Sequence, residues 1–292
     1  MKSVMSNKLV ITLYVLPALI LILLLIYIPI VLTGYYGLMD WNGIGAMKFI
    51  GLDNYIELVQ DKLFWKSTWH SLLLGIFSTA SLIGYLILSL ILASKIKGAN
   101  FLRKIYLIPM LLSSVAIGQL WAKIFDPTNG MLNRLLVMVG VENPPLWLAD
   151  SKIVLFAIFI PIVWQYAGFY IIIFYAALKN VPEELIEAAK IDGATPIQIA
   201  YKIKVPLISD VIKVMVILAI VGSLKYFDLI FVLTGGGPNH SSEVMASYMY
   251  SEAFSKYNFG YGSAIGFGLL VICLAMTWLI QKLLSSKEEV GH

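Results

Sequence analysis

The chain has 292 residues, of which 60% are hydrophobic and 13% are charged, and its formal net charge is +4. A soluble domain contains about 25% charged residues, so this chain has too little polar surface to cover a water-soluble body of its size. With a mean hydropathy of +0.86, the composition excludes disordered, fibrous and nucleic-acid-binding proteins. It predicts an integral membrane protein surrounded by lipid, with no nucleic-acid partner.

Six apolar segments are long enough to cross a membrane, for which a helix needs roughly 20 mostly apolar residues. They are residues 10–32, 72–93, 105–125, 153–178, 206–232 and 262–280. The first is too long for the apolar core of a signal peptide and no small-residue cleavage site follows it, so we expect it to be retained. No repeat or shift in composition marks a boundary. We therefore predict one all-α membrane domain with six transmembrane helices over residues 1–292.

Lysine and arginine residues are unevenly divided among the segments that flank these predicted spans. Twelve of the 21 lie in the two terminal segments and in the loops after spans two and four. The other three loops are longer but hold only seven. Because loops rich in lysine and arginine stay in the cytoplasm, we expect both termini on the cytoplasmic side.

No motif for catalysis or nucleotide binding is recognisable in the sequence. The P-loop pattern is absent, as are the nucleophile and zinc motifs of common hydrolases. The three histidines, His70, His240 and His292, are far apart and have no cysteine or histidine at ligand spacing. We therefore predict no catalytic residue, no metal site and no cofactor in this chain.

The loop between spans four and five, residues 179–206, carries the clearest local signals. Pro182 followed by Glu183 and Glu184 is typical of a helix start, because acidic side chains are favourable at the positive end of the helix dipole. Gly193 predicts the end of that helix, and Thr195 predicts the start of a second one. Both helices have an apolar side. Such a loop either folds back onto the helix bundle or docks into a partner, and the pattern alone leaves both open.

The spacing within this loop resembles the EAA loop of ABC importer permeases. Glu187-Ala188-Ala189 is followed after three residues by Gly193, and nine residues later by Ile203-Lys204-Val205-Pro206. Val205 stands where leucine is usual, which is a conservative departure. Phe227–Pro238 and Phe49–Tyr55 are similar to the carbohydrate branch of the family, in particular to the maltose-type first permease subunit. The large extra outer domain of the maltose permease itself is absent here.

The resemblance implies a type I ABC importer permease fold with a cytoplasmic coupling helix between spans four and five, in a prokaryotic cytoplasmic membrane. Its implied partners are a second permease subunit, a dimer of ATP-binding-cassette ATPases that binds Mg-ATP, and an extracytoplasmic sugar-binding protein. The residues expected to couple to the ATPase are Glu187, Ala188, Ala189, Asp192, Gly193, Ile203 and Pro206. For Glu187, the alternative is a solvated pair with Lys190, worth about 0.2–0.5 kcal/mol.

Polar and aromatic side chains within the spans are candidates for the substrate path. On span four, Gln165 shares a helix face with Phe169, four residues on, and Tyr166 follows Gln165. The resemblance implies that Gln165, Tyr166 and Phe169, with Ser223 and Tyr226 on span five, occupy the positions at which the family contacts substrate. Ser113 and Ser114 on span three are weaker candidates. Aromatic residues at this spacing also serve simply as packing, and that alternative stays open.

Two charged residues lie close together in the sequence at the end of span five. Lys225 and Asp228 are three residues apart, and we expect them to form a structural ion pair. The alternative is that Lys225 attracts an anionic substrate such as a sugar phosphate or glycerol phosphate.

A different class of protein, an ion-coupled secondary carrier, would need buried acidic residues within its spans. Spans one, two, four and six carry no charge, which argues against such a carrier. An intramembrane enzyme is a further alternative, but no nucleophile–base pair is present.

Overall fold

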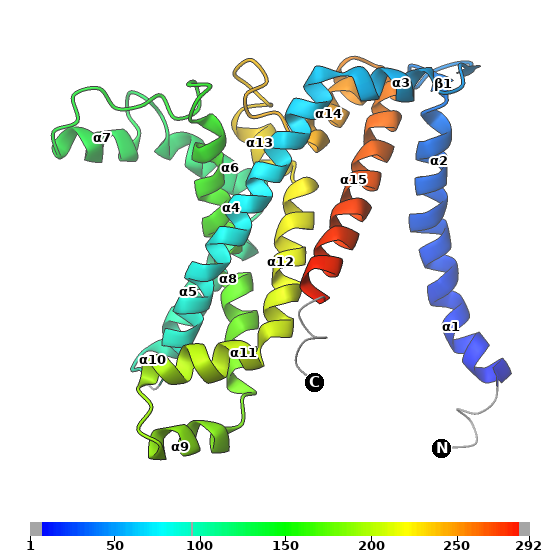
Figure 1. Ribbon diagram of the computed structural model, residues 1–292. Helices are drawn as coiled ribbons and strands as arrows, with labels where there is room; N and C mark the ends of the chain where they lie inside the picture. Colours follow the sequence, from blue (N-terminus) through cyan, green and yellow to red (C-terminus); the bar gives the residue numbers. More distant parts are fainter. Residues whose placement is uncertain (1–7, 95, 286–292) are drawn as a thin grey trace. The chain divides into compact units, whose positions relative to one another are not determined.

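The computed structural model describes residues 8–94 and 96–285, and it is mainly helical (Figure 1). Within these residues, five helical stretches are long and apolar enough to cross a membrane, or six if one bent pair is counted as a span. The five are Val10–Tyr36, Lys62–Ala93, Val154–Lys179, Ser209–Leu233 and Phe259–Leu284. The predicted all-α membrane fold is confirmed.

The third predicted span, 105–125, was wrong as a continuous helix. It consists of α5 (Ala99–Leu111) and α6 (Ser114–Ile124), which meet at a 98° bend. Pro109 lies in the last turn of α5 and Leu112 is extended, so the helix ends there. The Ser113 hydroxyl then accepts a hydrogen bond from the Ala116 N–H at 3.2 Å and starts α6 as its N-cap.

The other spans differ from their predicted bounds mainly at the ends. The first comprises α1 (Lys8–Ile22), a π-helical stretch over Leu23–Tyr27 and α2 (Ile28–Tyr36). The second, α4 (Lys62–Ala93), starts ten residues before its predicted start, and the fourth, α8 (Val154–Lys179), agrees with its prediction. The fifth is divided into α12 (Ser209–Leu224) and α13 (Asp228–Leu233), and the sixth is α15 (Phe259–Ser285).

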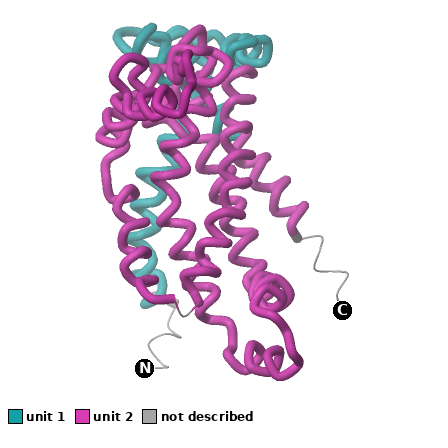
Figure 2. Tube along the Cα trace, turned by 90° about the vertical axis from the view of Figure 1, so that its left-hand side faces the viewer, with its two compact units in different colours: residues 1–64, 248–271 teal, residues 65–247, 272–292 magenta. Residues whose placement is uncertain are grey.

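Two compact units make up the chain, residues 1–64 with 248–271 and residues 65–247 with 272–292 (Figure 2). In the first unit, β1 (Met39–Asp40) pairs antiparallel with β2 (Lys48–Phe49), and α3 (Asp53–Gln60) follows. The buried Asn54 donates hydrogen bonds to the carbonyls of Gly37 and Met39 at 3.0 and 2.9 Å. This single amide fixes α3 against the hairpin. α14 (Met245–Tyr250) and a π-helical stretch, Ser251–Ser255, precede α15.

A carboxylate binds the end of α3 to later parts of the same unit. One oxygen of Asp61 accepts hydrogen bonds from the hydroxyls of Tyr248 at 2.5 Å and Tyr261 at 2.6 Å. Burial alone would raise the pKa of Asp61, but these two bonds and those from the backbone N–H groups of Leu63 and Phe64 together lower it. Burial and the bond to Asp61 raise the pKa of Tyr248.

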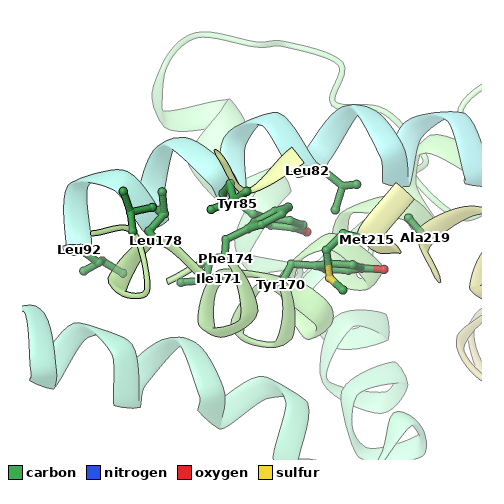
Figure 3. Close-up of a cluster of buried hydrophobic side chains, with 11 residues drawn as sticks. Leu82, Tyr85, Leu92, Tyr170, Ile171, Phe174, Leu178, Met215 and Ala219 are labelled. Carbon is green, nitrogen blue, oxygen red and sulfur yellow. The ribbon is translucent and has the colours of Figure 1, made fainter. Parts of the chain in front are cut away.

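The core of the second unit is built from α4, α5, α8 and α12. The rings of Tyr85 and Tyr170 stack with centroids 5.5 Å apart, beside the fully buried Ile171 and Phe174 (Figure 3). Gly168 brings α8 close to α5, since a Cβ placed on it would lie 2.2 Å from the carbonyl oxygen of Tyr106. A side chain is therefore excluded at this crossing.

Helix α8 separates two groups of short helices within the second unit. At its carboxyl end lie α9 (Glu183–Ile191), α10 (Pro196–Ile199) and α11 (Val205–Leu207), and near its amino end lies α7 (Met131–Met138) (Figure 1). The loop 179–206 thus lies at the end of the unit opposite to α7.

Candidate functional site

The loop 179–206 folds as two short helices joined by a glycine turn. α9 begins directly after Pro182, with Glu183 and Glu184 in its first turn, as predicted. Gly193 has a φ of +79° and ends the helix. The Gly193 N–H donates to the Lys190 carbonyl at 3.1 Å, and the Ala194 N–H donates to the Ala189 carbonyl at 2.9 Å. These bonds satisfy carbonyls that the helix end would otherwise leave unpaired.

A capping box starts the second helix at Thr195. The Thr195 hydroxyl accepts from the Gln198 N–H at 3.3 Å, and the Gln198 side chain accepts from the Thr195 N–H at 2.7 Å. Two backbone donors are satisfied by this reciprocal pair. The helix continues through a π-helical stretch, Ala200–Lys204, into α11, which holds Pro206. The turn between the two helices is therefore fixed on both sides.

The outer surface of this loop is strongly apolar. The side chains of Ile191 and Ile197, on either side of Gly193, are 86% and 76% exposed, and Leu185 is also exposed. On the inner side, Val181 and Ile186 pack against the core of the second unit, and Ile199 is buried. The loop is thus anchored on the bundle and still presents an apolar face away from it.

The predicted coupling residues divide between exposed and partly buried positions of the loop. Glu187, Ala188, Asp192, Gly193 and Pro206 are exposed, whereas Ala189 and Ile203 are partly buried. Within the described residues, Glu187 has no ion pair with Lys190. Burial, together with the charges of Lys179 and Lys190, lowers the pKa of Lys204.

A cavity of about 190 Å³ lies in the second unit between α4, α8 and α12. Its lining combines aromatic rings with small hydroxyl groups. The polar members are Ser78, Ser81, Tyr85, Tyr166, Tyr170, Ser223 and Tyr226, and the apolar ones include Phe169. Every lining residue is uncharged. Such a surface can stack against the C–H face of a sugar ring and exchange hydrogen bonds with its hydroxyls.

Most of the predicted path residues meet at this cavity. Tyr166, Phe169, Ser223 and Tyr226 line it, and the Tyr166 and Tyr226 rings lie edge to face with centroids 6.2 Å apart. The hydroxyls of Ser223 and Ser78 are 3.1 Å apart.

Gln165, Ser113 and Ser114 do not line the cavity. The buried Gln165 donates to the Ser114 hydroxyl at 3.3 Å and accepts from the Tyr226 hydroxyl at 3.4 Å. The Gln165 amide therefore holds the lining residue Tyr226 in place without lining the cavity itself. Ser113 serves as the N-cap of α6.

The residues of α4 that line the cavity were not among those predicted from the sequence. Ser78, Ser81 and Tyr85 follow one another at intervals of three and four residues and so share one helix face. That spacing, in a span without charges, was the available signal. The Tyr85 hydroxyl donates to the Val163 carbonyl of α8 at 2.8 Å.

The expected ion pair between Lys225 and Asp228 was wrong. Both side chains are exposed, and in the part of the chain that the structure describes they form no ion pair with each other. The helix is interrupted between them, at Lys225–Phe227, so the i, i+3 geometry of a continuous helix is lost. On α12, the pair that forms is Lys213 with Asp210, at 3.0 Å.

Comparison with known families identifies the fold and its class. Residues 85–287 match the model of the family described as binding-protein-dependent transport system inner membrane component. The chain belongs to this family. The match includes the loop 179–206 and most of the cavity-lining residues, including Tyr85, Tyr166 and Ser223.

The similarity to individual relatives extends over almost the whole chain. A probable ABC transporter permease of Pyrococcus horikoshii is 38% identical over 269 residues, covering 91% of this chain and 92% of the relative. The trehalose/maltose transport system permease protein MalF of Thermococcus litoralis is 33% identical over 276 residues, covering 92% of both chains. These relatives are transporter permease subunits and not enzymes.

A solved structure supports the type I permease fold of this family member. A chain of the bacterial alginate ABC transporter, in complex with an alginate-bound periplasmic protein, superposes with a TM-score of 0.82 at 22% identity. The match covers 96% of this chain and 94% of that chain.

Proposed function

We propose that this chain is one permease subunit of an ATP-driven importer and forms half of the path for a sugar or oligosaccharide. A second permease subunit, two ATPase subunits and an extracytoplasmic binding protein complete the assembly, and both termini of the chain face the cytoplasm. The observation that carries this proposal is the glycine-fixed pair of helices α9 and α10, with its exposed apolar face.

The geometry of that loop is suited to transmitting a movement. The Gly193 turn and the Thr195 capping box hold the two helices at a defined angle, and Val181 and Ile186 pack against the core of the second unit. Exposed apolar surface of this kind marks a protein interface. A subunit that grips Ile191 and Ile197 would therefore move the bundle together with the loop, and ATP hydrolysis in that partner would drive the change of access.

The cavity supports a neutral sugar as the cargo. Its tyrosine rings and serine hydroxyls can recognise a carbohydrate, and the described residues that line it include no cation that would offset the charge of a phosphate group. Among the relatives, the Thermococcus protein is named for trehalose and maltose transport. We therefore favour a sugar or oligosaccharide over a sugar phosphate, which was the alternative for Lys225.

Co-purification tests the coupling role of the loop. Tagged wild-type chain, extracted in detergent from its host membrane, should bring down an ATPase subunit, whereas Ile191→Asp and Ile197→Asp should lose it. Glu183→Gln, in the first turn of α9, is the matched control, since it changes charge without touching the apolar face. Equal ATPase recovery from all four proteins would refute the proposed docking surface.

A further inference from the structure

The short helix α7, between α6 and α8, presents an apolar stripe that nothing in the described chain covers. Met131, Leu135 and Met138 follow one another at intervals of four and three residues, so they share one face of the helix. Their side chains are 59%, 51% and 79% exposed. An exposed apolar stripe of this kind is typical of a surface that contacts another protein, a ligand or the membrane.

The opposite side of α7 is fixed to the loops that flank it. Asn133, on the far side of the helix from the stripe, is buried and donates to the carbonyls of Pro127 at 3.2 Å and Pro145 at 3.4 Å. It also accepts a hydrogen bond from the indole N–H of Trp147 at 2.7 Å. These bonds set the rotation of α7 about its own axis.

That rotation turns the stripe away from the loops. In Figure 1 the flanking loops arch over α7 on the side away from α9, and the helix lies crosswise near the amino end of α8. Because the bonds of Asn133 hold the opposite face of α7 to the flanking loops, the face that carries Met131, Leu135 and Met138 is turned away from the carbonyls of Pro127 and Pro145.

The charge pattern of α7 also fits a membrane surface. Arg134 lies beside the stripe, and its side chain donates to Asn129 at 3.0 Å. The eight residues of the helix include no acidic residue. An amphipathic helix with apolar residues on one face and a basic residue at its border lies in the plane of the bilayer, with the apolar face about 5–10 Å into the headgroup region.

We propose that α7 is an interfacial helix whose Met131–Leu135–Met138 stripe rests in the lipid bilayer. Arg134 lies at the level of the lipid phosphates. The helix thereby fixes the depth of α6, the second half of the broken third span, because a connection of only six residues joins them. This inference depends on the chain being a membrane protein and not on what it transports.

Spin-label accessibility tests the inference. In a Cys273→Ala background, which removes the single cysteine, nitroxide labels are attached at Leu135→Cys, Met138→Cys and, as a control, Val137→Cys. Val137 is exposed but lies toward the Asn133 side of α7. The assembled transporter is placed in nanodiscs of phosphatidylcholine and phosphatidylglycerol.

Labels at Leu135 and Met138 should collide more with oxygen, which concentrates in lipid, than with a water-soluble nickel chelate. The label at Val137 should show the reverse. Chelate access at all three positions would place α7 in water and overturn the proposal. Exclusion of both reagents at Leu135 and Met138 would mean that a protein covers the stripe, which also overturns it. Met131→Cys replaces either stripe variant if that variant does not assemble.

Discussion

The hydroxyl oxygens of Ser78 on α4 and Ser223 on α12 lie 3.1 Å apart, although 145 positions separate them in the chain. Ser223 also donates to the carbonyl of Ala219, one turn earlier, at 2.8 Å. The pair closes one side of the uncharged cavity. A sugar hydroxyl that enters the cavity can replace this contact without leaving either serine unpaired.

Removing either serine hydroxyl should weaken sugar uptake. A typical hydrogen bond contributes about 0.5–1.5 kcal/mol, so Ser78→Ala and Ser223→Ala should each raise the KM of uptake several-fold. Because they share a contact, the double variant should cost less than the two single effects combined. Ser89→Ala is the control. It removes a buried hydroxyl that bonds the Tyr85 and Ile171 carbonyls away from the cavity, so it should change stability but not KM.

A side chain at Gly168 should disrupt the packing of α5 on α8. A methyl group there would meet the Tyr106 carbonyl oxygen at 2.2 Å and the Leu107 Cα at 2.9 Å; both atoms belong to the backbone, so the two helices themselves would have to shift. Gly168→Ala should therefore destabilise the protein by about 1–3 kcal/mol, measured as a lower Tm in detergent. Gly84→Ala on α4 has open space around it and should leave the Tm unchanged or slightly higher.

The need for glycine at position 193 should come from its backbone conformation and not from a lack of space for a side chain. No atom lies within 4 Å of a Cβ placed there, but the φ of +79° disfavours any residue that carries one. Gly193→Val should cost about 1–2 kcal/mol locally and reduce ATP-driven uptake strongly. Asparagine tolerates this region of φ, so Gly193→Asn should retain most of the uptake. Equal loss in both variants would mean that the side chain, and not the turn, is what the partner rejects.

Acid should weaken the first unit through Asp61. Its pKa is lowered in the folded chain from the ordinary value of 3.8, so its stabilising contribution is complete above pH 3.8 and is lost as the pH falls through the lowered value. Asp61→Asn should lower the Tm at neutral pH, and the difference from wild type should shrink below pH 3.8. The exposed Asp53→Asn is the control. A Tm difference that does not vary with pH would contradict this role.

The spans and the helices of the loop 179–206 were predictable because their signals are local. Apolar length determines a span, and the turn residues Pro182, Gly193 and Thr195 each act on the next few residues. The structure places the start of α9, its end at Gly193 and the start of the second helix at Thr195 where these residues predicted them.

The bend in the third span and the full cavity were less predictable because they depend on tertiary contacts. Pro109 is a local signal for a helix end, but prolines such as Pro161 also lie inside a continuous α8. Neighbouring helices decide between these outcomes. The serines and tyrosine on α4 became recognisable as cavity residues only when Ser223 and Tyr226 were placed opposite them. The Lys225–Asp228 pair failed for a similar reason, since it assumed an unbroken helix.

The most direct test of the account is ATP-dependent sugar uptake by the reconstituted complex. Proteoliposomes that hold this chain with its co-purified permease and ATPase subunits are supplied with the binding protein, labelled sugar and internal Mg-ATP. We predict uptake that requires ATP and all the subunits, and that fails when Gly193→Val replaces the wild-type chain. Uptake by this chain alone, driven by an ion gradient without ATP, would contradict the central claim.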